Sequence, residues 1–158
     1  MIEKLIRRFL TISARLGVIK KIHTIVYTGD IASTNDIYQS RHFGVRLSIE
    51  RKFSKIFRTL FAVNKPPKVN EFGLIIFYNN KMDVCNLSFM QKMFVDSFKK
   101  EEKWVRIKNS EGEIIKKWKE LVYKGFVDND DQRYFKFMMI CPDKKLPKET
   151  LEFNICVL

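Results

Sequence analysis

Two groups of acidic residues in this sequence could hold a divalent cation. Asp83 stands where an apolar run ends, and Asp128, Asp130 and Asp131 cluster in a single short stretch. If the fold placed Asp83 beside the cluster, the carboxylates would repel one another and a bound cation would relieve the repulsion. Divalent metals held by aspartates hydrolyse phosphodiesters. The alternative is a plain polar turn, because Asp and Asn favour turns.

Other short motifs accompany these acids. In chain order they are Ser33-Thr34-Asn35-Asp36-Ile37-Tyr38, then Asp83-Val84-Cys85-Asn86-Leu87, then Lys92 and Asp96, then Gly125-Phe126-Val127 leading to Asp130-Asp131. In this order they resemble the motifs of the RusA family of Holliday junction resolvases, and the region of His42 and Arg46 resembles phage-type members. The resemblance extends over residues 24–157.

The resemblance implies a fold, an activity and a site. The fold would be α+β, with one mixed sheet packed against helices in a single domain, 1–158. The activity would be a magnesium-dependent endonuclease that resolves branched DNA in recombination and repair, acting as a homodimer. By resemblance, Asp83, Asp130 and Asp131 would hold Mg²⁺ or Mn²⁺, and Asp83, Asp131 and Lys92 would be catalytic.

The role of Lys92 has two interpretations. Its ammonium group could stabilise charge at the scissile phosphate. It could equally form an ordinary helical ion pair with Asp96, four residues further on, which is worth about 0.2–0.5 kcal/mol.

Cys85 departs from the family pattern, because it stands where the motif has its second Asp. Magnesium prefers oxygen ligands, whereas a thiolate prefers zinc or copper. The exchange is expected to weaken both metal binding and catalysis. Alternatively, Cys85 faces the core as a small hydrophobic residue.

The charge of the chain indicates a polyanionic partner. Thirty Lys and Arg stand against eighteen Asp and Glu, which gives a formal net charge of +12 and a pI of about 9.7. Such a charge attracts nucleic acid first and an anionic membrane surface second, unless it reflects composition alone. We expect branched or duplex DNA, and no membrane, as the partner. The predicted DNA-binding residues are Asn35, Arg46, Arg51, Lys52, Lys55 and Arg58.

Cysteine usage and hydropathy exclude several classes of protein. The three cysteines form no CxxC pair, so neither a disulfide framework nor a zinc site is expected. We therefore expect a reducing, cytoplasmic setting. No run of about twenty apolar residues exists, so no transmembrane helix is predicted.

The elements that must position these residues follow from hydrophobic periodicity. Residues 1–17 predict an amphipathic helix with one broad apolar face, packed on the body, although a membrane-surface helix is an alternative. Residues 43–61 and 86–98 predict helices. Strands are expected at 23–27, 72–78, 134–140 and 151–157, and the residues from Thr28 to Tyr38 are expected to form a polar turn.

The segment 99–120 is the most charged part of the chain and lengthens the link between the motifs. Ile114, Trp118, Leu121 and Val122 predict an amphipathic helix there, with Trp118 buried in the core or in an interface. The segment is either a DNA-contacting or partner-binding arm, or a solvated helix with no partner.

Three functions therefore compete. The first is the metal-dependent endonuclease, and the second is a relative that binds nucleic acid without cutting it. The third is a membrane- or protein-interaction module built around the N-terminal helix.

Overall fold

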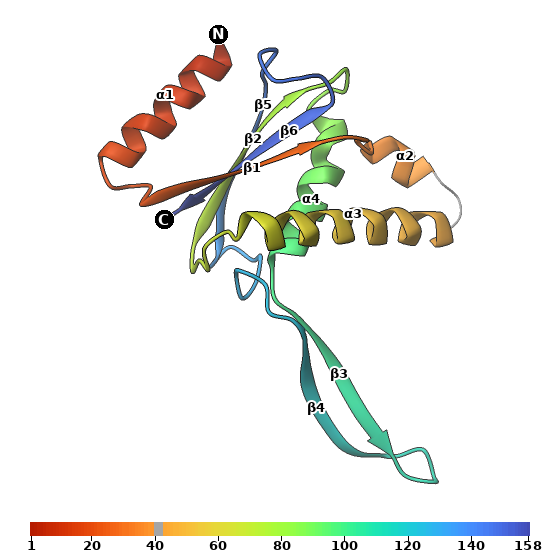
Figure 1. The fold of residues 1–158 in the computed structure, drawn as a ribbon. Coiled ribbons are helices and arrows are strands. Elements are labelled where there is room, and N and C mark those ends of the chain that lie inside the picture. Colours follow the sequence, from red (N-terminus) through yellow and green to blue (C-terminus); the bar gives the residue numbers. More distant parts are fainter. Residues whose placement is uncertain (40–42) are drawn as a thin grey trace.

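The centre of the protein is a mixed four-stranded sheet. The computed structural model describes residues 1–39 and 43–158, and His42 lies outside them. The strand order is β1 (Lys21–Thr28), β6 (Thr150–Val157), β2 (Phe72–Asn79), β5 (Phe135–Pro142). β6 is antiparallel to both of its neighbours, and β2 is parallel to β5 (Figure 1). The expected α+β architecture is confirmed at this level.

Strand β2 lies inside the sheet, between β6 and β5, and both of its faces are covered. Its residues from Phe72 to Tyr78 are all buried. Leu74 and Ile76 pack into one apolar core, while Ile75 and Phe77 pack into a second core on the other face. A near-continuous apolar run is what such a strand requires.

Helices α3 (Phe43–Asn64) and α4 (Ser88–Phe98) cover the first face. Phe57 and Phe61 of α3 meet Phe94 of α4 edge-on, with ring centroids 5.4 and 5.0 Å apart. Phe94 also stacks on Phe153 of β6, with centroids 4.1 Å apart. Many of the fourteen phenylalanines in the chain are therefore core residues, and their rings fix how the two helices sit on the sheet.

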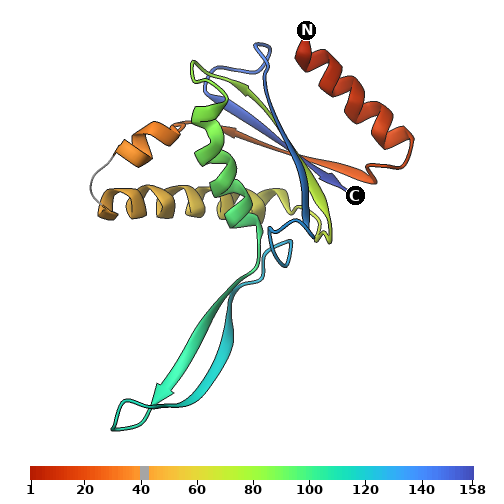
Figure 2. The ribbon, with the colours of Figure 1, turned by 180° about the vertical axis from the view of Figure 1, so that it is seen from behind.

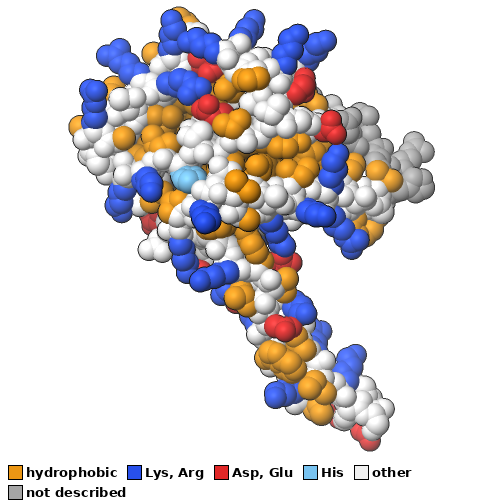
Figure 3. Space-filling view, in the orientation of Figure 1, with side chains coloured by type: hydrophobic (Ala, Val, Ile, Leu, Met, Phe, Trp, Pro, Cys, Tyr) orange, Lys and Arg blue, Asp and Glu red, His pale blue; other side chains and the backbone are white. Residues whose placement is uncertain are grey.

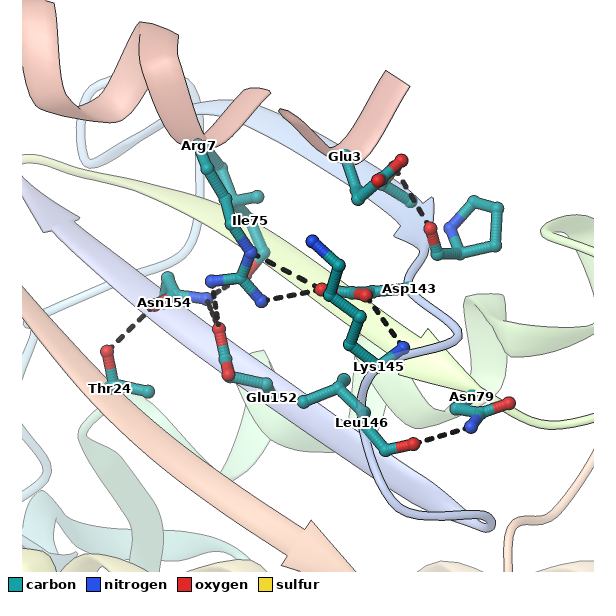
Figure 4. A network of polar contacts seen from close by, with 12 residues as sticks. Glu3, Arg7, Thr24, Ile75, Asn79, Asp143, Lys145, Leu146, Glu152 and Asn154 are labelled. Carbon is teal, nitrogen blue, oxygen red and sulfur yellow. Dashed lines mark hydrogen bonds and ion pairs between the residues drawn. The ribbon is translucent and has the colours of Figure 1, made fainter. Parts of the chain in front are cut away.

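Helix α1 (Ile2–Arg15) lies on the opposite face of the sheet. Leu10 is the apolar side chain of α1 that is buried there, while Ile6 is partly buried. Arg7 fixes the helix, since its guanidinium donates to Asp143 Oδ2 at 2.8 Å and lies 3.2 Å from Glu152 Oε1 (Figure 4). The helix is confirmed, but most of its predicted apolar face remains exposed.

The segment expected to be a polar turn contains helix α2 (Thr34–Gln39). Thr34 makes the contacts of a cap with the start of α4. Its hydroxyl lies 2.8 Å from Ser88 Oγ and accepts a hydrogen bond from the backbone N–H of Phe89 at 3.3 Å. A short 3₁₀ helix, η1 (Cys85–Leu87), precedes α4.

The charged segment forms a two-stranded arm, so the prediction of a helix there is wrong. Strands β3 (Glu101–Lys108) and β4 (Ile114–Tyr123) are antiparallel and project from the body (Figures 1 and 2). The turn between them contains Gly112 at a φ of +84°, a conformation that favours glycine. Trp118 is 37% exposed, so its predicted burial in the core is also wrong.

The two ends of the arm meet at one narrow root. Lys99 and Val127 form an isolated bridge, and the N–H of Lys100 donates to the carbonyl of Val127 at 2.8 Å. Gly125 adopts a φ of +59°, and a Cβ there would lie 2.4 Å from the backbone nitrogen of Lys100. The root therefore requires glycine for both conformation and space.

Candidate nucleic-acid interface

Asp83 lies just beyond the carboxyl end of β2. Its side chain accepts hydrogen bonds from the backbone N–H of Asn86 at 2.9 Å and from the Asn86 amide at 3.2 Å. Asp83 thus stabilises the turn that leads into η1. The Ser33–Asn35 motif lies alongside, because the Thr34 hydroxyl donates to the carbonyl of Asn86 at 3.1 Å. Two motifs separated by some fifty residues thus meet here.

Asp130 and Asp131 lie at the other end of the sheet. The carbonyl of Asp131 accepts from the N–H of Phe135, the first residue of β5. Phe135 pairs with Phe72, the first residue of β2. Because the two strands are parallel, Asp83 and Asp131 are separated by the length of an eight-residue strand, roughly 25 Å.

Two of the three carboxylates predicted to bind metal, Asp130 and Asp131, have protein cations as partners. Lys99 Nζ lies 3.1 Å from Asp130 Oδ2, and Arg133 Nη2 lies 2.7 Å from Asp131 Oδ2. Hydrogen bonds from Arg133 lower the pKa of Asp131. Among the described residues no group of three His, Cys, Asp or Glu side chains could hold a metal ion. Within one chain these residues therefore do not fit a magnesium ion.

Lys92 also has a partner on its own helix. Its ammonium group bonds the carboxylate of Asp96, four residues later. Asp96 is also bonded by Lys99 at 3.2 Å. The ion-pair interpretation of Lys92 thus describes its contact in the structure, and Lys92 lies on the helix that leads away from Asp83.

Cys85 is exposed, so its alternative placement as a core residue is wrong. It opens η1, beside Asp83 and Thr34, and its carbonyl accepts from the Ser88 hydroxyl at 2.9 Å. A side chain at position 85 can thus change without disturbing the core.

A basic groove lies between α3 and the root of the arm. Its volume is about 620 Å³. Arg51, Lys55 and Arg58 recur at intervals of four and three residues, so they point to one side of α3. Neither Arg51 nor Lys55 forms an ion pair with any other described residue. The groove is lined by Arg51, Ser54, Lys55, Arg58, Thr59, Ala62 and Glu101.

Arg58 connects the groove to the arm. Its guanidinium pairs with Glu101, the first residue of β3, and stacks 4.4 Å from the ring centroid of Tyr123, the last residue of β4. The groove wall is therefore held by contacts to both strands of the arm.

The other predicted DNA-binding residues lie outside the groove lining. Arg46 bonds Glu50 at 2.9 Å, and Lys52 bonds Asp30 at 3.2 Å. Asn35 is exposed on α2. Of the six residues proposed from sequence, Arg51, Lys55 and Arg58 share one surface, which we call the α3 groove.

The arm adds an aromatic and cationic surface, which was not expected because the segment was predicted to be a helix. Trp104 pairs across the strands with Lys119, and Arg106 pairs with Lys117. These four side chains share one face of the arm because directly paired residues point to the same side. Lys117 Nζ lies 4.2 Å from the Trp104 ring centroid. Trp104 is 52% exposed.

In the space-filling view, hydrophobic side chains form patches on both the arm and the body, and Lys and Arg are spread over the visible face of both (Figure 3). Residues 101–123 contain six Lys or Arg and five Glu, so most of the excess positive charge lies on the body.

No family model, curated protein or solved structure matches the chain.

The helical prediction missed two features of this site. The hairpin signal was Asn109-Ser110-Glu111-Gly112 between two β-rich segments. Tyr123, the cation–π partner of Arg58, had no signal, because the contact joins residues far apart in the chain.

Proposed function

We propose that the protein binds the phosphate backbone of nucleic acid in the α3 groove, with the arm lying along the bound strand or duplex. The observation that carries the proposal is the alignment of Arg51, Lys55 and Arg58 on one side of α3, where two of the three have no ion-pair partner among the described residues. Unpaired cations on successive turns match the regular spacing of phosphates.

Charge and shape support this assignment. The net charge of +12 attracts a polyanion at long range. Glu101, the first residue of the arm, lines the groove, so the groove lies beside the root of the arm. Ser54 adds a hydroxyl group that donates to a phosphate oxygen. The Thr59 hydroxyl instead donates to the carbonyl of Lys55 at 2.9 Å. Trp104, with Lys117 and Lys119 beside its ring, supplies a surface on which an unpaired base can stack.

Binding, and not cleavage by a single chain, is the function that this arrangement favours. The RusA resemblance predicts a magnesium-dependent nuclease, but Asp83 and Asp131 lie at opposite ends of the sheet. Cleavage of a Holliday junction would therefore require the carboxylates of a second copy, as in the predicted homodimer.

The test is fluorescence anisotropy with a labelled duplex and a labelled four-way junction at increasing salt. The paired variant Arg51→Gln/Lys55→Gln removes two groove cations. We expect weaker binding and a log–log salt slope shallower by about 1.8, since each phosphate contact contributes about 0.9. The matched control, Lys144→Gln/Lys148→Gln, removes the same charge from the exposed loop between β5 and β6.

Two results would overturn the proposal. One is an affinity that does not change between low and physiological salt. The other is an equal loss of affinity in the control pair, which would mean that net charge alone, and not the groove, binds the nucleic acid. Cleavage of the junction with magnesium or manganese, lost in Asp131→Asn, would instead support the nuclease.

A further inference from the structure

Helix α1 carries a stripe of apolar side chains that the body does not cover. Ile2, Leu5, Phe9, Ile12 and Leu16 follow one another at intervals of three and four residues, so they lie along one side of the helix and its cap. Their exposed fractions run from 43% for Phe9 to 73% for Leu16. We call these five residues the outer stripe. The sheet instead packs against Leu10 and Ile6.

Cations run beside the outer stripe. At 100° per residue, Lys4, Arg8 and Arg15 form an adjacent row on the helix, and Lys20 and Lys21 follow at the start of β1. All five are exposed, and none forms an ion pair with a described residue. Arg7 differs, because it turns toward the sheet and bonds Asp143 (Figure 4).

We propose that the outer stripe docks on the surface of an anionic phospholipid membrane. In this position α1 lies parallel to the membrane plane. Its apolar side chains enter the boundary between headgroups and acyl chains, while Lys4, Arg8 and Arg15 contact lipid phosphates. An amphipathic helix with basic residues beside its apolar face has the composition that interfacial binding requires.

The charge beside the outer stripe distinguishes between two partners that could cover it, a second copy of the chain and an anionic lipid surface. A second copy of the chain would bring the same five cations and another net charge of +12, so like charges would oppose the pairing. An anionic lipid surface neutralises those cations while it covers the apolar side chains. The basic row is therefore complementary to lipid and not to itself.

The position of α1 leaves the proposed nucleic-acid site free. Helix α1 lies on one face of the sheet, and α3 lies on the other (Figures 1 and 2). The groove is lined by α3 and by Glu101 of the arm. Docking through the outer stripe would hold the α3 groove away from the membrane. The lipid site can thus be tested separately from the groove.

The experiment is co-sedimentation of the protein with phosphatidylcholine–phosphatidylglycerol vesicles and with vesicles of phosphatidylcholine alone. Two variants test the two halves of the surface. Leu5→Ser/Phe9→Ser is expected to lower the affinity for the anionic vesicles at least about tenfold. Arg8→Gln/Arg15→Gln is expected to lower it roughly thirtyfold, since each cation near an anionic surface contributes about one factor of five.

Matched controls separate docking from general attraction. Val63→Ser removes an exposed apolar side chain from α3, and Arg51→Gln/Lys55→Gln removes two groove cations. We expect both to bind the anionic vesicles within about twofold of the unchanged protein, because neither site meets the membrane. Melting temperatures of all variants check the fold. If Leu5→Ser/Phe9→Ser has a lower melting temperature than the unchanged protein, the vesicle affinity of Arg8→Gln/Arg15→Gln is the result that tests the proposal.

Three outcomes would overturn the proposal. The first is that the α1 variants bind anionic vesicles as tightly as the unchanged protein. The second is that the groove pair loses vesicle binding to the same extent as the α1 charge pair. The third is a dimer in light scattering that Leu5→Ser/Phe9→Ser dissociates, which would assign the outer stripe to a second copy. Loss of nucleic-acid binding in the groove pair, with vesicle binding retained, separates this site from the proposed function.

Discussion

The ammonium group of Lys99 lies between two carboxylates, 3.1 Å from Asp130 Oδ2 and 3.2 Å from Asp96 Oδ1. Burial alone would lower the pKa of Lys99, but the hydrogen bonds and charges of Asp130 and Asp96 outweigh it, so its pKa is raised. A protein cation thus pairs with Asp130, one of the three acids predicted to hold a metal. The contact also ties the end of α4 to the segment before β5.

Replacement of Lys99 is expected to loosen this junction. Lys99→Met leaves the Asp130 and Asp96 carboxylates without their shared cation and should lower the free energy of unfolding by about 1 kcal/mol, a value set by partial exposure. Urea denaturation measures the loss. Lys92→Met is the control, since Asp96 keeps Lys99 there, and a smaller loss is expected. Equal losses would mean that the bridge between α4 and the Asp130 segment contributes nothing.

Placing the Asp of the RusA motif at position 85 should leave the protein stable and without a metal site. Because Cys85 is exposed, the new carboxylate in Cys85→Asp stays hydrated, and stability should change by less than about 0.5 kcal/mol. Magnesium or manganese should not raise the melting temperature of the variant, since Asp131 lies at the other end of the sheet. Thermal melts with and without metal measure both effects.

Cys156 provides the contrasting control for that experiment. It is fully buried, and burial raises the pKa of its thiol to about 11. Cys156→Asp should therefore cost several kcal/mol. A metal-dependent rise in the melting temperature of Cys85→Asp would contradict this interpretation and would point to a site completed by a second copy.

Local periodicity predicted the elements of the body well, but it did not predict their order in the sheet. The sequence identified α3 because Phe53 and Phe57 repeat at helical spacing on one buried face. It identified β2 because the whole strand is apolar and buried on both faces. The positions of Asp83 and Asp131 depend on the parallel pairing of β2 with β5, which no short motif contains. Their separation could therefore not be predicted from spacing.

The prediction of a helix in the arm failed for a different reason. Leu121 and Val122 fit the face of a helix, but strand β4 is exposed along nearly all its length and has no alternating buried face. Charged residues occur on both sides of the arm, so the period-two signal of a half-buried strand is missing. Only the turn at Asn109–Gly112 distinguished the two possibilities.

The contact between Arg7 and Asp143 predicts that the free energy of unfolding falls at low pH. Burial would raise the pKa of Asp143, but the hydrogen bonds from Arg7 and from the Lys145 backbone outweigh it and leave its pKa below the usual 3.8. The native state therefore favours the carboxylate. This contribution is complete above about pH 4–5 and is lost as pH falls through the lowered pKa.

Asp143→Asn isolates this effect. The variant should be less stable than the unchanged protein at neutral pH, by on the order of 1–3 kcal/mol, and the difference should shrink as pH falls below 3.8. Urea denaturation at several pH values measures it. A difference that stays constant down to the lowest pH at which the protein folds would contradict the assignment of the acid effect to Asp143.

The arm root should be sensitive to a single added methyl group. Gly125→Ala combines a positive φ with a Cβ placed 2.4 Å from the Lys100 nitrogen, so it should cost more than about 1 kcal/mol. Gly112→Ala at the arm tip also has a positive φ but has no atom within 4 Å of its Cβ. It should cost less, and thermal unfolding compares the two. An equal cost would show that backbone conformation alone, without the close approach, explains the effect.

The bridge between Lys99 and Val127 closes residues 100–126 into a loop at its root. The length of this loop can therefore change without altering the structure of the body. Because the chain leaves and returns at neighbouring positions, a shorter or longer hairpin changes neither the register of β2 with β5 nor the seat of α4. The entropy of closing such a loop rises by only about 0.6 kcal/mol for each doubling of its length. A change in the length of the arm therefore costs the fold little free energy. The core fixes the sheet and the helices of the body regardless of that length.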